Sequence, residues 1–304
     1  MSCFHPITAY WSKYLTENGK RKIVFNARDA LNTDIKLQVP CGSCIGCRLE
    51  YARVWALRCW HESLLYPDNS FITLTFDDDH LSKDGSLHKV DFVNFMKRLR
   101  HKFPNVRFFH CGEYGDESNR PHHHAILFNC AFPDRKPIGI SKHGDIYYKS
   151  ALLSDLWNNQ GFCSIGEVTF KSCSYVARYV MKKLKGESAK FYFENNLTPP
   201  YLTMSRRPGI GSNWFKKNRS QVESQLGVRT DAGVMSPVPR FYQNQFSDSA
   251  AARLKYVKSH SILDKKKSID YDFIDMYQVF LNDERANVLE TIKETQITSL
   301  KRKL

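Results

Sequence analysis

The amino-acid sequence predicts an α+β fold: a central antiparallel sheet flanked by helices, preceded by a cysteine-rich knuckle and followed by a mainly helical region. Short segments that alternate apolar and polar residues, such as 70–76, have the two-residue period of strands. Longer segments with apolar residues every three to five positions, such as 48–65, have the period of amphipathic helices. Hydrophobic residues make up 42% of the 304 residues, which is enough to bury a large core.

The first 47 residues carry cysteines at a spacing typical of a metal site. Three of them form a C-x2-C-x2-C pattern, Cys41, Cys44 and Cys47. Closed structural zinc sites take four ligands, so a fourth must come from elsewhere in the chain. Cys3 is the first candidate and His5 the second. Structural Zn²⁺ is the favoured interpretation, and an iron–sulfur cluster or reduced thiols without metal are the alternatives.

The first helix and strand of the core follow the cysteines. Residues 48–65 predict an amphipathic helix, which the Pro67-Asp68-Asn69 segment ends. Residues 70–76, SFITLTF, predict a central strand because β-branched and aromatic residues fill it. Three aspartates come directly after this strand, and capping of a turn or helix is favoured over a metal contact for them. Residues 88–103 predict the next helix.

Residues 106–128 predict a β-hairpin with three consecutive histidines where its second strand begins. Side chains alternate between the two faces of a strand, so His122 and His124 share one face and His123 takes the other. Two imidazoles on one face are the beginning of a divalent-metal site. Three surface histidines beside a turn are the alternative.

The register of this hairpin decides whether Glu113 is a third ligand. If the loop runs from Tyr114 to Pro121, symmetric pairing places Glu113 opposite His122, and one ion can bridge the carboxylate and both imidazoles. If the loop instead ends at Arg120, Glu113 moves to the opposite face. A His/His/carboxylate set with open positions suits a metal that also holds substrate.

A helix at 171–186 follows a short helix at 150–160 and a strand at 162–170. Tyr175 and Tyr179 are four residues apart and are therefore neighbours on one helix face. Each has a cation three positions later, Arg178 and Lys182. A phenol with a pKa of about 10 costs about 4 kcal/mol to ionise at pH 7, and a nearby cation lowers that cost. Two core tyrosines are the alternative.

The remaining sequence is basic and holds fewer motifs. A basic, glycine-containing loop precedes a tryptophan and further cations, which suits phosphate contact and base stacking by Arg206, Arg207, Trp214, Lys216 and Lys217. A solvated loop packed by the tryptophan is the alternative. Residues 222–238 predict a linker, and two helices are expected around 247–259 and 271–294.

Charge and composition indicate a polyanionic partner. There are 45 Lys and Arg against 31 Asp and Glu, a net charge of +14, which points to nucleic acid before an anionic membrane. No apolar run approaches the ~20 residues that span a bilayer, and the N-terminus lacks the apolar core of a signal peptide. A cytosolic protein is expected, so its nine cysteines are interpreted as thiols or metal ligands.

Several motifs occur together and in order, and the chain resembles a known family because of them. They are FITLTFDD at 71–78, GEYG at 112–115, RPHHHAILF at 120–128, YVARYVMKK at 175–183 and MSRRPGIG at 204–211. These motifs resemble rolling-circle replication initiators of the HUH endonuclease superfamily, most closely those of microviruses of the gokushovirus type. The resemblance covers most of residues 1–215. It departs at His123, where the family usually has an apolar or aromatic residue.

The resemblance implies a metal-dependent nickase and strand transferase acting on a single-stranded DNA origin. Tyr175 or Tyr179 would attack a phosphodiester, while Glu113, His122 and His124 would hold Mg²⁺ or Mn²⁺. The products would be a 5′-phosphotyrosine and a free 3′-OH that primes replication. No G-x-x-x-x-G-K-[ST] loop is present, so unwinding would fall to a host helicase and synthesis to a host polymerase. The implied location is the cytoplasm of an infected bacterial cell.

Three segments are expected: a cysteine-rich segment and helix at 1–66, the endonuclease core at 67–186, and a basic, helical region at 187–304 that binds DNA or a partner. Two other functions would also explain parts of the sequence. A non-catalytic, zinc-containing DNA-binding protein accounts for the charge and the cysteines. A metal-dependent nucleotide hydrolase without a covalent step accounts for the histidines and does not require the tyrosines.

Overall fold

The computed structural model describes residues 3–115, 119–141, 144–182, 187–267, 284 and 286–297. Within its helices, the side chains at 179–182, 187–189 and 261–267 are also outside the described set. The chain divides into two compact units, one formed by residues 1–50 with 270–304 and the other by residues 51–269. This division groups the chain differently from the three expected segments.

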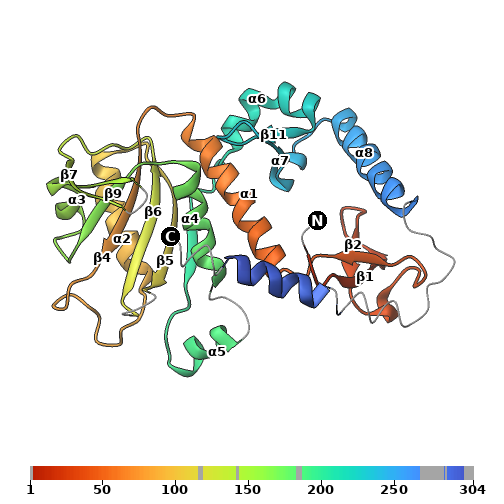
Figure 1. The fold of residues 1–304 in the computed structure, drawn as a ribbon, viewed down its shortest axis with the longest axis horizontal. Helices are drawn as coiled ribbons and strands as arrows, with labels where there is room; N and C mark the ends of the chain where they lie inside the picture. The colour runs from red at the N-terminus through yellow and green to blue at the C-terminus, as the bar shows by residue number, and fades with distance from the viewer. Residues whose placement is uncertain are drawn as a thin grey trace. The chain divides into compact units, whose positions relative to one another are not determined.

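A seven-stranded sheet forms the centre of the larger unit (Figure 1). Its strand order is β10-β5-β6-β4-β9-β8-β7, and every neighbouring pair is antiparallel. The strands are β4 (Asn69–Thr75), β5 (Arg107–Tyr114), β6 (Pro121–Phe128), β7 (Lys136–Ile140), β8 (Ile146–Lys149), β9 (Cys163–Gly166) and β10 (Tyr201–Met204). Helices cover this sheet, so the predicted α+β fold is confirmed.

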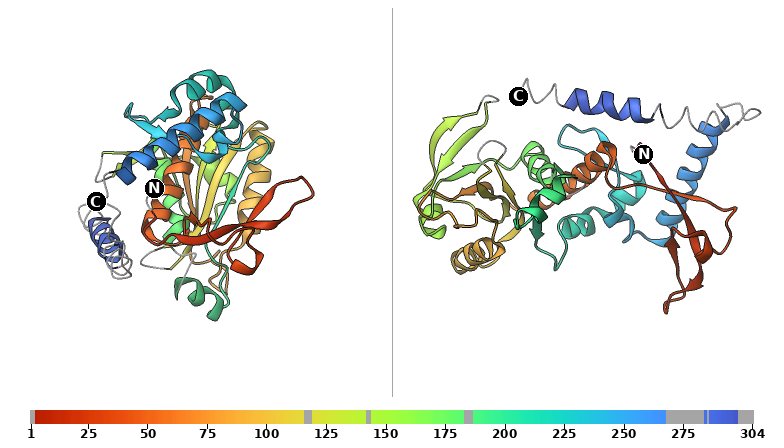
Figure 2. Two further views of the ribbon diagram at one scale, coloured as in Figure 1. Left: turned by 90° about the vertical axis from the view of Figure 1, so that its right-hand side faces the viewer. Right: turned by 90° about the horizontal axis from the view of Figure 1, so that it is seen from below.

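One face of the sheet packs against α2 (Lys89–Lys102) and α3 (Ala151–Leu156) (Figures 1 and 2). Alternate residues of the strands point to this face and form its core with the apolar stripes of the two helices. Fully buried members include Phe95 of α2, Trp157 after α3 and Leu127 of β6. Burying a large side chain of this kind stabilises the fold by about 1.5–3 kcal/mol.

The opposite face packs against α1 (Ile45–Ser63) and α4 (Phe170–Lys182). Small residues of the helices, such as Ala56 and Cys173, let them approach the aromatic side chains of the sheet, such as Phe109. The helix expected at 171–186 is therefore present up to Lys182, and residues 183–186 lie outside the described part. The residues of β5 and β6 that bear on function divide between these two faces.

The hairpin of β5 and β6 has symmetric pairing, with Glu113 opposite His122 and Tyr114 opposite Pro121. The loop is one residue shorter at each end than the Tyr114-to-Pro121 loop expected, and the Gly115 N–H donates to the Arg120 carbonyl at 3.0 Å to close it. The two changes cancel, so the register that places Glu113 beside His122 is kept. Pro121 fits because it is the first residue of its strand.

The rest of the larger unit is a helical region around a small hairpin. Its elements are α5 (Glu187–Glu194), α6 (Ser212–Gln225), β11 (Gly227–Arg229), β12 (Met235–Pro237), α7 (Arg240–Gln243) and α8 (Asp248–Lys267). The linker expected at 222–238 is wrong, because α6 continues into it and β11 pairs with β12. Val222, Val228 and Val238 anchor these elements in one buried cluster.

The smaller unit contains a three-stranded antiparallel sheet of order β2-β1-β3. The strands are β1 (Ile7–Leu15), β2 (Arg21–Val24) and β3 (Leu37–Val39), and a 3-10 turn, η1 (Ala27–Asp29), lies between the last two. A helix over residues 286–297 belongs to the same unit, whereas the part of the expected helix at 271–283 lies outside the described residues. Among the described residues, none of the helices has the length and apolarity needed to span a membrane.

Candidate functional site

Glu113, His122 and His124 bring three metal-binding atoms together on the α4 face of the sheet. The Nε2 atoms of His122 and His124 lie 3.0 and 2.9 Å from the Oε1 atom of Glu113. One donor atom from each side chain lies within 4.8 Å of the others. The three residues come from adjacent strands, so the sheet itself fixes their spacing.

Hydrogen bonds on the far side of each imidazole orient these donors. The Nδ1–H of His122 donates to the Arg120 carbonyl at 2.9 Å, which leaves its Nε2 lone pair directed at Glu113. Nδ1 of His124 lies 2.9 Å from the Thr73 hydroxyl. Such outer partners fix the ring orientation of metal-binding histidines. Thr73 and Arg120 were not expected as site residues, although Thr73 follows from the strand alternation of 70–76.

The charges of the three side chains fit a divalent cation. Burial raises the pKa of Glu113, but hydrogen bonds with His122 and His124 outweigh it and the net pKa is lowered, so the carboxylate is ionised. Burial lowers the pKa of His124 despite the opposing effect of Glu113. The second oxygen of Glu113, Oε2, is buried without a hydrogen-bond partner among the described residues. A carboxylate and neutral imidazoles are the donor set of a divalent metal.

His123 points to the opposite face, as expected from the alternation. Its Nδ1 atom lies 3.1 Å from Nε2 of His110, and the His110 ring stacks on Phe92 with 3.5 Å between centroids. Both histidines are fully buried, and burial lowers the pKa of His123 to about 3. His123 is therefore a neutral core residue, which accounts for its place in a position that is usually apolar or aromatic.

Helix α4 places Tyr175 against the three donors. The helix begins at Phe170 because Thr169 and Ser172 cap it reciprocally: the Ser172 N–H donates to Oγ1 of Thr169, and the Thr169 N–H donates to Oγ of Ser172. The Tyr175 ring meets the His124 ring edge-on with 5.4 Å between centroids. A partly buried phenol thus lies beside the metal-binding atoms.

The other predicted residues of this helix are placed in part. Arg178 is exposed, one turn after Tyr175. Tyr179 and Lys182 belong to α4, and their side chains lie outside the described set. Their positions one turn apart keep the expected pattern of a tyrosine followed by a cation.

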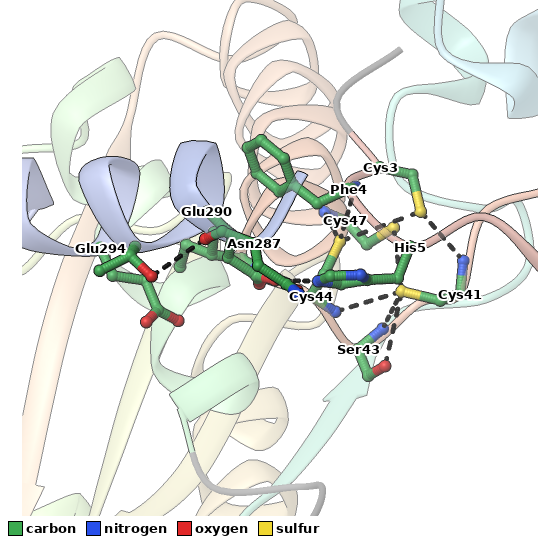
Figure 3. A network of polar contacts seen from close by, with 12 residues as sticks. Cys3, Phe4, His5, Cys41, Ser43, Cys44, Cys47, Asn287, Glu290 and Glu294 are labelled. Carbon is green, nitrogen blue, oxygen red and sulfur yellow. Dashed lines mark hydrogen bonds and ion pairs between the residues drawn. The ribbon is translucent and has the colours of Figure 1, made fainter. Parts of the chain in front are cut away.

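A second cluster lies in the smaller unit, where Cys3 joins Cys41, Cys44 and Cys47 (Figure 3). One sulfur from each residue lies within 4.8 Å of the others. Of the two candidates for the fourth position, Cys3 is the residue in the cluster. His5 pairs instead with Glu290 of the 286–297 helix. All nine cysteines are free thiols.

Two basic grooves contain four of the five residues expected to bind DNA. A groove of about 590 Å³ between α2 and β10 is lined by apolar side chains and by four cations, Lys97, Arg100, Arg206 and Arg207. A groove of about 510 Å³ between α6 and α8 includes Lys216 and Lys217. Lys97 and Arg100 were not expected, because their nearness to the 204–211 loop depends on tertiary packing.

Trp214 has a different environment from its expected role in base stacking. Its ring stacks on His61 with 3.5 Å between centroids and lies beside Tyr242. The hydroxyl of Tyr242 lies 3.1 Å from Nδ1 of His61. One face of the indole is therefore covered by the protein, and the contact helps to join α6 to α1.

Comparison with known proteins assigns the chain to a class. A family model for replication-associated proteins of the ORF2 type matches residues 69–184, the segment from β4 to α4 that contains the histidine hairpin and both tyrosines. The fold and site thus define a replication-associated protein. No solved structure matches the chain.

Individual relatives narrow the class. The replication-associated protein VP4 of Bdellovibrio phage phiMH2K is 35% identical over 255 residues, covering 81% of this chain and 77% of that protein. ORF2 of Spiroplasma virus 4 is 34% identical over 220 residues, covering 68% and 67%. ORF4 of Chlamydia phage 1 is 33% identical over 154 residues, covering 48% and 38%. The chain belongs to the family of phage replication-associated proteins, of the microvirus type.

Proposed function

We propose that this replication-associated protein initiates rolling-circle replication as a metal-dependent DNA nickase and strand transferase of the HUH type. The observation that carries the proposal is the convergence of Glu113, His122 and His124 beside the ring of Tyr175. A metal-binding set next to a tyrosine supports covalent phosphoryl transfer, because it joins a nucleophile to stabilisation of the charge that develops on phosphate. The family membership supports a role at the phage origin.

The metal would be Mg²⁺ or Mn²⁺, held by the three side chains, and it would polarise the scissile phosphodiester. Thr73 and the Arg120 carbonyl keep both imidazoles in the ligating orientation. In the nicking step the Tyr175 oxygen forms a bond to phosphorus and the bond from phosphorus to O3′ breaks. The phenol proton is lost and the leaving O3′ gains one, which gives a 5′-phosphotyrosine and a free 3′-OH.

A second tyrosine completes the cycle. Tyr179 lies one turn after Tyr175 in α4, so both phenols start from one face of the helix. After one round of synthesis the second tyrosine cuts the regenerated origin, and the freed 3′-OH attacks the first phosphotyrosine to close a circle. Each step exchanges one phosphodiester for another, so joining needs no nucleotide cofactor. Arg178 and Lys182 are the cations proposed to stabilise the phenolates.

Binding of the single-stranded origin is assigned to the two basic grooves. The groove between α2 and β10 combines four cations with aromatic and aliphatic side chains, which suits a phosphate backbone with unstacked bases. The groove at Lys216 and Lys217 adds further phosphate contacts. Host helicase and polymerase are the proposed partners, and the cytoplasm of the infected cell is the proposed location.

A covalent adduct on labelled single-stranded origin DNA tests the proposal. With Mg²⁺ or Mn²⁺, the protein should give a DNA-linked band on a denaturing gel. Tyr175→Phe and Tyr179→Phe, made singly and together, should alter or abolish it. His124→Ala should abolish the adduct while keeping salt-sensitive DNA binding. Cleavage that persists in the double tyrosine variant would favour a hydrolase without a covalent step. Absence of any cleavage by metal-loaded protein would favour a non-catalytic DNA-binding protein.

A further inference from the structure

The four sulfurs of the cysteine cluster have the spacing of a single tetrahedral ion. Cys41 Sγ and Cys47 Sγ are 4.0 Å apart, and Cys44 Sγ and Cys3 Sγ are 3.9 Å apart. A tetrahedron with Zn–S bonds of about 2.3 Å has S–S edges of about 3.8 Å. A disulfide needs about 2.05 Å. An iron–sulfur cluster inserts several irons and sulfides, which sets its thiolates further apart than one shared ion does.

Backbone N–H groups surround the sulfurs. Cys41 Sγ accepts from the N–H groups of Ser43 and Cys44 at 3.5 and 3.3 Å. Cys3 Sγ accepts from the Cys41 N–H at 3.3 Å. Cys44 Sγ accepts from the N–H groups of Phe4 and Cys47 at 3.5 and 3.4 Å. Such donors stabilise thiolates and orient them as metal ligands.

The cluster also forms the beginning of α1. The Arg48 N–H donates to the Cys44 carbonyl at 3.0 Å, so Cys44 is the residue that caps the helix. Its sulfur accepts from the third N–H of the helix, at Cys47, in the role that a serine or aspartate oxygen usually has. The helix N-terminus thus directs free N–H groups and its positive dipole end at a ligand sulfur.

The 286–297 helix meets the cluster through one carboxylate (Figure 3). Glu290 Oε1 accepts from the Ile45 N–H at 2.8 Å, and its Oε2 pairs with His5. One turn later Glu294 pairs with Arg48 at 3.5 Å. A single side chain of the C-terminal region therefore bonds both segments that supply the cysteines.

We propose that Cys3, Cys41, Cys44 and Cys47 bind one structural Zn²⁺ and that this ion shapes the surface on which the 286–297 helix docks. Four thiolates brought together without a cation repel one another, and the ion removes that cost. The ion fixes the positions of Ile45 and His5, which are the two groups that Glu290 bonds. The site is separate from the Glu113 cluster and does not depend on the nickase function.

Metal analysis of the full-length protein tests the zinc site. The purified chain should contain one zinc per molecule, and Cys44→Ser should lose it. Cys130→Ala, which removes a buried thiol outside the cluster, and His124→Ala should both keep it. Cobalt substitution should give an intense thiolate charge-transfer absorption that Cys44→Ser lacks. Zinc retained by Cys44→Ser, iron in place of zinc, or a chain that takes up neither zinc nor cobalt would overturn the proposal.

Hydrogen–deuterium exchange tests the docking. Chelation of zinc should speed exchange in both 45–48 and 286–297. Glu290→Gln should keep the zinc and speed exchange in the same two segments by about tenfold, because it weakens a charge-assisted hydrogen bond. Glu284→Gln, an exposed change near the start of the same helix, is the matched control. Unchanged exchange in 286–297 after zinc removal would refute the link between the ion and the helix.

Discussion

Thr73 offers the sharpest test of the metal site, because it touches a ligand and not the metal. Its hydroxyl lies 2.9 Å from Nδ1 of His124, on the side of the ring away from Glu113. When Nε2 binds a metal, Nδ1 carries the proton and donates it to the hydroxyl. Thr73→Val keeps the β-branched shape and removes this acceptor, whereas Thr73→Ser keeps it. Thr73 is thus a positioning residue.

The size of the effect follows from burial. Loss of an outer partner of a metal-binding histidine lowers metal affinity about 10–100-fold, or roughly 1.4–2.7 kcal/mol. His124 is 5% exposed, so water has little access to replace the lost hydroxyl. We therefore expect Thr73→Val to weaken Mn²⁺ binding near the upper end of this range. Thr73→Ser should restore most of it.

The assay is direct titration of Mn²⁺ by calorimetry or by its paramagnetic resonance signal, with nicking followed as a function of Mn²⁺. Thr73→Val should shift the Mn²⁺ dependence to higher concentration and leave the rate at saturating Mn²⁺ close to wild type. Thr75→Val is the control, since Thr75 lies two residues on, on the same face of β4. Equal Mn²⁺ affinity in Thr73→Val and wild type, or equal losses in both valine variants, would refute the proposed orientation of His124.

Three further predictions concern the body of the protein. Glu62→Gln should destabilise the fold by roughly 3–5 kcal/mol in urea denaturation, because the buried carboxylate pairs with Arg107 and the change leaves that cation without its charge. Burial lowers the pKa of His61 to about 4, so stability should fall by about 3 kcal/mol as the pH drops from about 6.5 to 4, where only the unfolded chain takes up the proton. Replacing both Lys97 and Arg100 by Gln should reduce the slope of log affinity for single-stranded DNA against log salt by about 1.4, since each phosphate contact contributes about 0.7.

Each of these has a control in the same chain. Glu194→Gln is an exposed change that should leave stability within about 0.5 kcal/mol of wild type. His61→Asn cannot titrate and should flatten the fall in stability below pH 6.5, and a fall of unchanged size would assign it to other groups. Lys255→Gln, on the exposed surface of α8, should leave the salt slope unchanged. An equal change in slope for Lys255→Gln would mean that charge alone, and not the α2–β10 groove, governs binding.

The sequence predicts the centre of the fold well because strand alternation is a strong local signal. The 70–76 and 106–128 segments each bury one side chain in two against a particular helix layer, so their register follows from their pattern. Thr73 could have been found from the same alternation, since it shares a face with His124 in the neighbouring strand. The exact loop ends did not follow, because they depend on a hydrogen bond between Gly115 and Arg120.

Other parts of the structure depend on contacts between segments far apart in the chain. The β1–β3 sheet was not predicted, although the alternation in ITAYWSKYL and the ENG turn after it are typical of a hairpin. The β11–β12 hairpin has strands of three residues, too short for a periodic signal. The α2–β10 groove joins residues about 100 positions apart, which no local pattern can show.

The alternation that divides the three histidines also explains how a sequence with an unusual central histidine can keep a metal site. His122 and His124 face α4 and the Tyr175 ring, where Glu113 gives them a charged partner. His123 faces α2 and hydrogen-bonds to His110 in a fully buried pocket, where protonation is strongly disfavoured. The strand thus separates imidazoles that face a carboxylate from one that the core keeps neutral. Which of the three can take part in catalysis is therefore decided by the face of β6 on which each lies, and not by its place in the motif.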